Sequence, residues 1–361
     1  MASITQYREF QPKALKGVLD ASIEQSEPTF ADEFVGNEVS YDIRFAYDII
    51  QRKQHIAAMI GLGAEKPVID RHGAASRMVE LAHFGLKDIV TIEELYEINA
   101  ARNDADRQNR INRLLNRSVD LVNYLQLRKR VEKIKAVAFG SNTYDKNGVK
   151  IELDYGVPED HKIALTSGND WSDLDRDIIG DLIGWVETYK KNNAGKAPEA
   201  MLVSRKVFGQ LALNRTLIAE AGRPETATRI SEAELNEVLG RYGIPTIKVV
   251  EETTFTVNDI YTGEDEVIEV FPENRVVFIA KGVGNFITGP NPDAPNMEPI
   301  ATLEAYNERT PRRDIIEVAE SGFVVLDNPS LLLHADVIEP SETVSEPVTE
   351  PVTDPVTETT P

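Results

Sequence analysis

The sequence predicts an α+β protein in which one unusually long helix supports β-sheets. Three observations lead to this prediction. Residues 106–139 show helical periodicity and contain neither proline nor glycine. Strand-like alternation precedes this stretch and returns after residue 300. Between these two regions helix and strand patterns follow one another, and the whole order of elements is typical of a mixed architecture.

The long helix is predicted from Asp106 to Phe139 because its apolar residues recur at steps of three and four. Those steps place one stripe along the helix, made of Ile111, Leu114, Leu115, Leu121, Val122, Leu125, Val131, Ile134 and Val137. Asn103 or Asp104 can cap its start, and Gly140 stands where a left-handed stop residue is expected. At ~1.5 Å per residue the helix is about 50 Å long, far beyond an ordinary globular helix. We therefore expect it to act as a support for the sheets.

Residues 1–38 are weakly periodic and too polar to form a core alone. One short amphipathic helix is expected, with apolar positions at Phe10, Leu15, Val18, Leu19 and Ile23. An extended arm with aromatic anchors is expected after it, at Pro28, Phe30, Phe34 and Val35. Such a segment should lie along another surface, and should be disordered until it does so.

Residues 39–92 are expected to contain a long extended hairpin. The segment Val39–Tyr47 alternates apolar and polar residues, which is the pattern of a half-buried strand. Two further strand-like runs, 61–76 and 77–86, are joined by a turn near Gly73. A two-stranded excursion of this kind buries too little surface for its own core, so it needs another surface to pack on.

Side-chain caps predict the starts of three shorter helices. The pairs are Thr91 with Glu94 for a helix ending near Ile98, Ser172 with Asp175 for Leu174–Tyr189, and Ser231 with Glu234 for Glu232–Leu239. A fourth helix, Arg205–Leu213, follows the strand EAMLVS directly.

The remaining elements are expected to be strands. They are a turn and a strand in 141–158, the strand Pro245–Val250, a hairpin around Phe255 and Val267, the buried strand Arg275–Ala280, and strands from Ile300 to Val337.

The composition excludes several classes of protein. Of 361 residues 41% are hydrophobic and 27% charged, which is ordinary for a soluble protein. The net charge of −21 argues against a general nucleic-acid binder. The absence of cysteine excludes disulfides, thiolate metal sites and a cysteine nucleophile. No apolar run reaches the ~18 residues of a membrane span, and no signal pattern stands at the N-terminus. We expect a soluble protein made in a cytoplasm, without a membrane partner.

The last segment, residues 339–361, differs in composition from the rest. It holds six acidic residues, no basic residue, and the repeat EPVT, EPVT, DPVT. Low complexity of this kind predicts a disordered acidic tail.

The densest group of acidic residues is Asp170, Asp173, Asp175, Asp177 and Asp181. Three of them have the alternate spacing of a calcium loop, but Ile178 replaces the glycine of the sharp turn and the late glutamate is missing. Acids in the first turn of a capped helix explain the group better.

No other motif predicts a catalytic, cofactor or metal site, so none is assigned. Gly282 and Gly284 form a bare GxG without the third glycine or a following helix. The histidines, His55, His72, His83, His161 and His334, have no ligand spacing. No HExxH, GxSxG, P-loop or kinase motif is present. The sequence does not predict an enzyme.

A basic stripe follows the long helix at Arg107, Arg110, Arg113 and Arg117, with Arg128, Lys129 and Arg130 further along. Such a stripe is most often a solvated face. The functional alternative is contact with phosphates or with acidic neighbours.

Several segments, taken in order, resemble the major capsid proteins of lambda-like tailed phages, the capsid protein E family. They are the long helix after a strand pair, WSDLDRDIIGDLIGWV, APEAMLVSRKVFGQLALNRTL, LNEVLGRYGIPTIKVVEE, FPENRVVFIAKGVGNFITGP and RRDIIEVAESGFVVLDNPSLLLHADV. The resemblance covers about residues 5–338 and lies in the order of the segments.

The resemblance implies a Hong Kong 97-like fold with a named division of the chain. The parts are an N-terminal arm (1–38), an E-loop hairpin (39–92), a peripheral domain with the spine helix (93–155), an axial domain (156–296) and the closing strands of the peripheral domain (297–338). Residues 339–361 remain as the acidic tail, which departs from the family core.

The function implied is that of a bacteriophage major capsid protein that assembles into an icosahedral shell around double-stranded DNA. Its partners would be itself, as pentamers and hexamers, the packaged DNA, and scaffold, portal and decoration proteins. It would be located in the virion and assembled in the host cytoplasm. The alternatives are an encapsulin-type compartment shell and an acidic cytoplasmic enzyme with an unrecognised carboxylate site.

Overall fold

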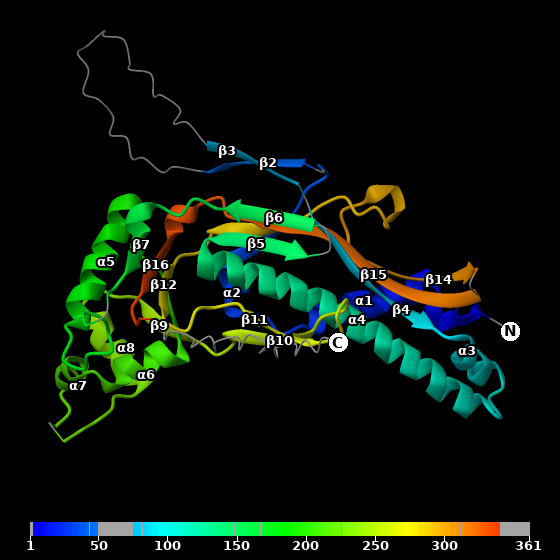
Figure 1. The fold of residues 1–361 in the computed structure, drawn as a ribbon, viewed down its shortest axis with the longest axis horizontal. Coiled ribbons are helices and arrows are strands. Elements are labelled where there is room, and N and C mark those ends of the chain that lie inside the picture. The colour runs from blue at the N-terminus through cyan, green and yellow to red at the C-terminus, as the bar shows by residue number, and fades with distance from the viewer. Residues whose placement is uncertain are drawn as a thin grey trace, which may run out of the picture.

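The computed structural model describes residues 3–42, 44–49, 75–80, 82–146, 149–166, 168–224, 226–310 and 312–339. One long helix, α4 (Asp104–Phe139), crosses the molecule with a five-stranded sheet beside it. A second five-stranded sheet stands at one end among the shorter helices α5–α8, on the left in Figure 1. Together these elements confirm the predicted mixture of helices and sheets around one long helix.

Helix α4 is the long helix that the sequence predicts, and its 36 residues begin and end at the expected caps. The Asn103 side chain accepts the Asp106 N–H at 2.7 Å. Gly140 ends the helix with φ 64°, in the left-handed region that favours glycine. A Cβ there would lie 2.6 Å from Val157 Cγ2, so space as well as φ requires glycine. The predicted apolar stripe is buried except for Leu115, which is partly exposed.

The first sheet gathers strands from four distant parts of the chain. Its order is β1–β13–β15–β14, and β4 also pairs with β15. The strands are β1 (Val35–Val39), β4 (Ala82–Val90), β13 (Gly284–Thr288), β14 (Thr302–Arg309) and β15 (Arg312–Val325). The pairing of β1 with β13 is parallel, and the others are antiparallel. The predicted strands after residue 300 are therefore confirmed, with β15 as the central strand.

The arm packs on its own chain. The expected amphipathic helix is α1 (Pro12–Gln25), which lies against α4 and β14. Ile4, Phe10, Leu15 and Leu19 are buried in one cluster with the N-terminal half of α4. The expectation of an extended arm is wrong for residues 30–34, which form α2 (Phe30–Phe34). A capping box between Thr29 and Asp32 starts this helix, and the sequence analysis missed it.

The predicted hairpin is only partly described. Strands β2 (Arg44–Ile49) and β3 (Ala75–Glu80) pair antiparallel over their whole length. The prediction of one strand over Val39–Tyr47 is wrong, because β1 ends at Val39 after pairing with β13 and β2 begins only at Arg44. The predicted turn near Gly73 lies outside the described residues.

Three further elements lie next to α4. The predicted helix after Thr91 is α3 (Ile92–Asn99), and its capping box with Glu94 is present. Beyond Gly140, one strand was predicted, but two form: β5 (Ser141–Lys146) and β6 (Val149–Asp154) pair as an antiparallel hairpin. This hairpin lies above the C-terminal half of α4 in Figure 1.

The second sheet has the order β7–β16–β12–β8–β9. Its strands are β7 (Lys162–Ala164), β8 (Ala200–Ser204), β9 (Thr246–Val250), β12 (Arg275–Ile279) and β16 (Leu332–Asp336). The helices beside it are α5 (Ile178–Asn192), α6 (Arg205–Leu213), α7 (Arg215–Glu220) and α8 (Glu232–Arg241). A separate hairpin, β10 (Thr254–Asn258) with β11 (Asp265–Glu269), confirms the one predicted around Phe255 and Val267.

The predicted start of α5 is wrong by four residues. Asp177, not Ser172, caps the helix by accepting the Gly180 N–H at 2.9 Å. The Leu174 carbonyl is not available to a helix, because it accepts the Arg215 N–H at 2.9 Å. Ser172 instead donates its hydroxyl to Asp170 at 3.2 Å.

Two strands lie in a different sheet from the one that the sequence-based division suggests. Strand β13, from the segment 156–296, belongs to the sheet along α4, while β16, from 297–338, belongs to the second sheet. Of the predicted tail, only Glu339 is described. In the described part of the chain no helix combines the length and the hydropathy needed to cross a membrane.

Candidate functional site

The acidic residues that resemble a calcium loop are all used within the fold. Asp175 pairs with Arg215 at 2.8 Å, and Asp177 caps α5. Asp181 accepts from Arg176 at 2.9 Å and from the Trp171 indole at 3.1 Å. No group of three or more potential metal ligands occurs among the described residues. Asp177 and Asp181 therefore stabilise the start of α5, whereas Asp170, Asp173 and Asp175 precede the helix. The prediction of acids in the first helical turn is right for Asp181 and wrong for those three.

Three of the five histidines are described, and two of them are buried. His334 donates from Nε2 to the Val137 carbonyl at 2.8 Å, at the end of α4. Burial lowers its pKa to about 4. His161 contacts the Leu332 carbonyl through Nδ1 at 2.7 Å, and burial lowers its pKa as well. Both rings are neutral components of the interior at physiological pH. His55 and His72 lie outside the described residues.

His83 lies in a Ser–His–Asp constellation that the sequence analysis missed. Its Nδ1 is 3.0 Å from Ser321 Oγ, and its Nε2 is 3.3 Å from Asp293 Oδ2. Ser321 is only 3% exposed, in the middle of β15, so a substrate carbonyl has no path to its hydroxyl. The three residues tie the loop at Asp293 to β4 and β15. They are too far apart in the chain for any sequence motif to reveal them.

The GxG sequence has a structural explanation. Gly282 has φ 79° in the turn before β13. Gly284 lies so close to β15 that a Cβ would come within 2.1 Å of the Val325 carbonyl. These glycines permit a turn and a close strand pairing, two backbone roles that the sequence pattern did not predict.

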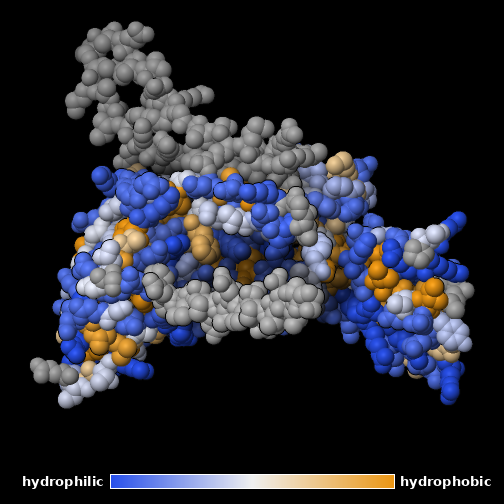
Figure 2. Space-filling model, viewed as in Figure 1, coloured by the Kyte–Doolittle hydropathy of each residue, from blue (hydrophilic) through white to orange (hydrophobic). Residues whose placement is uncertain are grey.

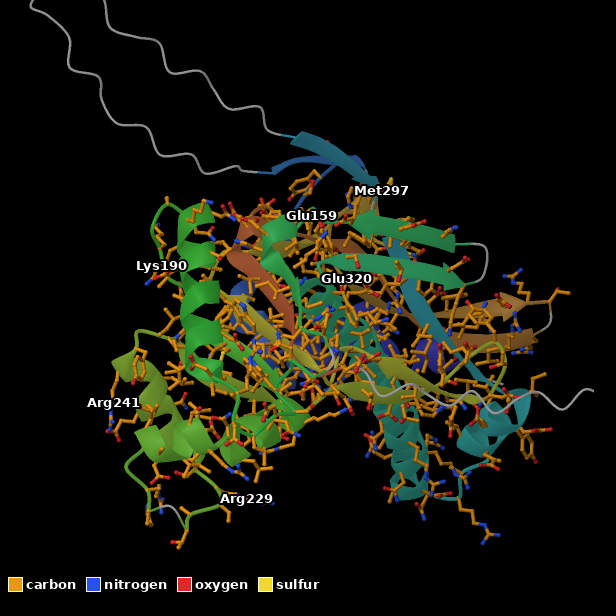
Figure 3. The ribbon with its side chains drawn as sticks, turned by 60° about the vertical axis from the view of Figure 1, so that its left-hand side comes forward. Glu159, Lys190, Arg229, Arg241, Met297 and Glu320 are labelled. Carbon is orange, nitrogen blue, oxygen red and sulfur yellow. The ribbon has the colours of Figure 1, made fainter. Side chains whose placement is uncertain are left out.

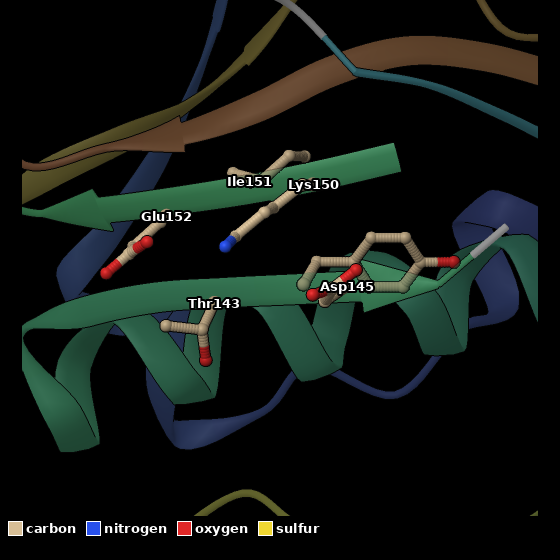
Figure 4. Close-up of a pocket in the computed structure, with 6 residues that line it drawn as sticks. Thr143, Asp145, Lys150, Ile151 and Glu152 are labelled. Carbon is tan, nitrogen blue, oxygen red and sulfur yellow. The ribbon is translucent and has the colours of Figure 1, made fainter. Parts of the chain in front are cut away.

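Two surface depressions occur in the described part of the chain. One of about 270 Å³ lies on the β5–β6 hairpin, beside Thr143, Asp145, Lys150 and Glu152. Figure 4 shows these side chains spread along the two strands rather than converging on one point. A second, of about 260 Å³, lies between the arm and the end of β9.

The basic stripe contacts acidic groups of the same chain. Arg107 pairs with Asp104 at 2.9 Å, and Arg110 pairs with Glu97 and Asp106. Arg117 reaches both Asp88 on β4, at 2.5 Å, and Glu94 on α3, at 2.7 Å. Arg113 is exposed. The stripe therefore holds β4 and α3 against the helix, which is the acidic-neighbour alternative realised within one subunit.

Burial alone would lower the pKa of Arg117, but the Asp88 and Glu94 carboxylates raise it above its usual value. The guanidinium therefore stays charged and paired.

The second half of α4 is tied to three other parts of the fold. Lys129 pairs with Glu320 of β15 at 2.8 Å, and its Nζ lies 4.7 Å from the centre of the Phe286 ring. Glu320 lies in the interior of the molecule, whereas Lys190 and Arg241 lie at its rim (Figure 3). Lys133, with a side chain 5% exposed, pairs with Asp32 of α2 at 2.7 Å.

Burial would raise the pKa of Asp32, but hydrogen bonds from Lys133 and the Thr29 N–H hold it below its usual value.

The described surface exposes large apolar side chains at several separate places. Ile260 and Tyr261 are 69% and 72% exposed at the tip of the β10–β11 hairpin. Ile92 and Tyr96 of α3 are more than half exposed. Figure 2 shows hydrophobic surface at this end of the molecule, near α3 and β4.

The fold is similar to two solved structures. The crystal structure of a putative capsid protein of a prophage, from E. coli CFT073, matches with a TM-score of 0.58 and 14% sequence identity, over 91% of this chain and 99% of the other. The crystal structure of a phage-related protein from Bordetella bronchiseptica RB50 matches with a TM-score of 0.51 and 14% identity, over 90% of this chain and 98% of the other. At this identity the likeness concerns the fold.

The sequence itself matches a family model. The model described as phage major capsid protein E matches residues 18–303. Comparison with curated proteins finds no match.

Proposed function

The chain belongs to the phage major capsid protein E family, and we propose that its copies form an icosahedral shell around double-stranded DNA. It is a structural protein, a phage major capsid protein with the Hong Kong 97-like fold, and a component of the virion. The observation that carries the proposal is the family match over residues 18–303, together with a long helix held under a sheet by paired charges. The encapsulin and enzyme alternatives are not favoured by these findings.

We assign the parts of the chain in the same terms. Residues 1–38 are the arm, and residues 39–92 are the E-loop hairpin. The peripheral domain comprises residues 93–155, which include the spine helix α4, and the closing strands in residues 297–338. Residues 156–296 are the axial domain, and residues 339–361 are the acidic tail. Strands β13 and β16 cross between the two domains, because each pairs in the other domain's sheet. The peripheral and axial domains are thus interleaved rather than joined by a simple linker.

The charge of the molecule bears on how DNA would be held. A net charge of −21 repels phosphates, and most arginines of the basic stripe are neutralised within the subunit. Any contact with packaged DNA would therefore be non-specific and weak. Containment by the closed shell, rather than binding, is the function that we assign to the subunit.

The partners follow from this function. Copies of the chain would meet as pentamers and hexamers, with scaffold and portal proteins during assembly and a decoration protein on the finished shell. Assembly would take place in the host cytoplasm. We assign no catalytic activity, cofactor or metal to the chain.

Electron microscopy of particles from cells that express the chain alone tests self-assembly, and particles from infected cells test the contents. We expect closed icosahedral shells in both cases, and nuclease-resistant double-stranded DNA only in the second. Closed shells that enclose a protein cargo and no DNA would favour the encapsulin alternative. Failure to form any closed particle would overturn the proposal.

A further inference from the structure

Strand β9 is an outer edge of the second sheet, with β8 on its only paired side among the described strands. The Ile247 N–H donates to the Asn236 side chain at 2.8 Å, so it points away from β8. Alternate residues of a strand direct their backbone groups to the same side, so Val249 also presents its N–H and C=O outward. When the outward groups of an edge strand are left uncovered, they are a template for pairing with another chain.

The arm covers this edge. We call residues 27–34 the edge guard. Its Glu33 pairs with Lys248 of β9, and the Lys248 Nζ lies 5.2 Å from the centre of the Phe34 ring. Further along, the first residues of the guard face Val249, Val250 and the two following glutamates across the depression of about 260 Å³. The guard therefore lies beside the C-terminal half of β9, from Lys248 onward.

Apart from its contacts with Lys248, the guard is anchored to the rest of the subunit. Asp32 pairs with the buried Lys133 of α4, and Phe34 is 2% exposed. Arg130 of α4 donates to the Glu27 carbonyl at 3.2 Å. Between the described residues of the guard and β9 no backbone hydrogen bond is made. The guard thus occupies the space beside β9 without extending the sheet.

We propose that the edge guard prevents β9 from pairing with β9 of a second copy. Subunits then associate only through other surfaces, and the second sheet stays closed to added strands. Covering an edge with a helix is one of the ways in which native proteins suppress such pairing. A single substitution at Glu33 can turn its attraction to Lys248 and Lys281 into repulsion.

The test is Glu33→Lys, which places a third cation beside Lys248 and Lys281. The matched control is Glu24→Lys on α1, an exposed position with the same charge change in the same arm. We expect a several-fold increase in open, irregular aggregates for Glu33→Lys by sedimentation velocity and electron microscopy. Hydrogen exchange of a peptide covering 246–252 should slow in the aggregated fraction, because edge amides become paired. Glu24→Lys should behave like the wild type.

A second substitution identifies the edge. Val249→Pro removes the outward N–H without removing a bond to β8, so it should suppress the aggregation of Glu33→Lys. Equal behaviour of Glu33→Lys and Glu24→Lys, or aggregation of Glu33→Lys with unchanged exchange at 246–252, would overturn the proposal. If Val249→Pro lowers the melting temperature of the subunit, the hydrogen-exchange measurement on Glu33→Lys alone decides whether β9 pairs in the aggregates. These readouts do not require closed shells, so failure here is distinguishable from failure of the proposed function.

Discussion

Lys129 of the spine helix and Glu320 of β15 form an ion pair of 2.8 Å, although the Glu320 side chain is only 2% exposed. The Thr288 hydroxyl adds a hydrogen bond of 3.1 Å to the same carboxylate oxygen. The pair joins the C-terminal half of the helix to the central strand of the sheet. Because burying a charge is unfavourable without a partner, the helix and the sheet depend on each other at this point.

We predict that Lys129→Met destabilises the subunit by roughly 3 kcal/mol, because it leaves a buried carboxylate without its cation. The double variant Lys129→Met with Glu320→Gln should recover most of this loss. Arg113→Met, on the exposed side of the same helix, is the control and should be near neutral. Urea unfolding of the subunit measures all three. A Lys129→Met variant as stable as the control would show that the pair contributes nothing.

We predict that Leu121→Asp unfolds the part of the chain built on the spine helix. Leu121 is 8% exposed and packs in the cluster that joins α1, α4 and the sheet. A buried carboxylate without a partner costs several kcal/mol, comparable to the stability of a whole domain. Asn123→Asp adds the same charge at an exposed position of the same helix and should leave the melting temperature unchanged. Melting of Leu121→Asp at the wild-type temperature would contradict the burial of the stripe.

We predict that Gly140→Ala costs more than the strain of φ 64° alone. The added Cβ would lie 2.6 Å from Val157 Cγ2 and 3.0 Å from His334 Cε1, so the end of the helix must shift. A loss of about 2 kcal/mol or more is expected. Gly184→Ala in α5 is the matched control, since nothing lies within 4 Å of its Cβ position, and it should be neutral or stabilising. Thermal unfolding of the two variants should therefore move in opposite directions.

We predict that the stability of the subunit depends on pH because His334 is buried. Its pKa is lowered to about 4 by burial, with Arg275 and His161 acting in the same direction and Asp336 opposing them. The unfolded chain therefore binds this proton more readily than the folded one. The stability present above pH ~6.5 falls as the pH drops toward 4, by an amount of order 3 kcal/mol.

His334→Gln keeps a donor for the Val137 carbonyl and removes the titrating group. The difference in unfolding free energy between wild type and His334→Gln should change between pH 7 and pH 4.5. His83→Gln, at a half-exposed histidine, is the control. A pH-independent difference for His334→Gln would show that the ring does not titrate as described.

The sequence was most informative where local chemistry decides the structure. The spine helix, its cap at Asn103 and its stop at Gly140 follow from periodicity and caps, and so do α3, α6 and α8. The start of α5 was misplaced because the Leu174 carbonyl bonds to Arg215, a contact 41 residues away that no local pattern reveals. Helix α2 was missed although its capping box, Thr29 with Asp32, is a local signal. The contacts of the edge guard with Lys133 and Lys248 could not be predicted, because both lysines lie far along the chain.

The functional surfaces were less predictable than the fold. The basic stripe was visible in the sequence, but its partners Asp88 and Glu94 lie on other elements, and only the structure shows that Arg117 is neutralised. The assembly function was inferred from the order of segments along the chain rather than from any single residue. The pairing of β13 and β16 across the two sheets required the three-dimensional fold.

We propose that this chain is the repeating subunit of a closed phage shell, with α4 as its support. Cryo-electron microscopy of particles assembled from the purified chain tests it most directly. We expect icosahedral symmetry and, in every subunit, one long helix packed under the sheet of β15 with Lys129 facing Glu320. Particles without icosahedral symmetry, or subunits in which α4 has left that sheet, would contradict the account.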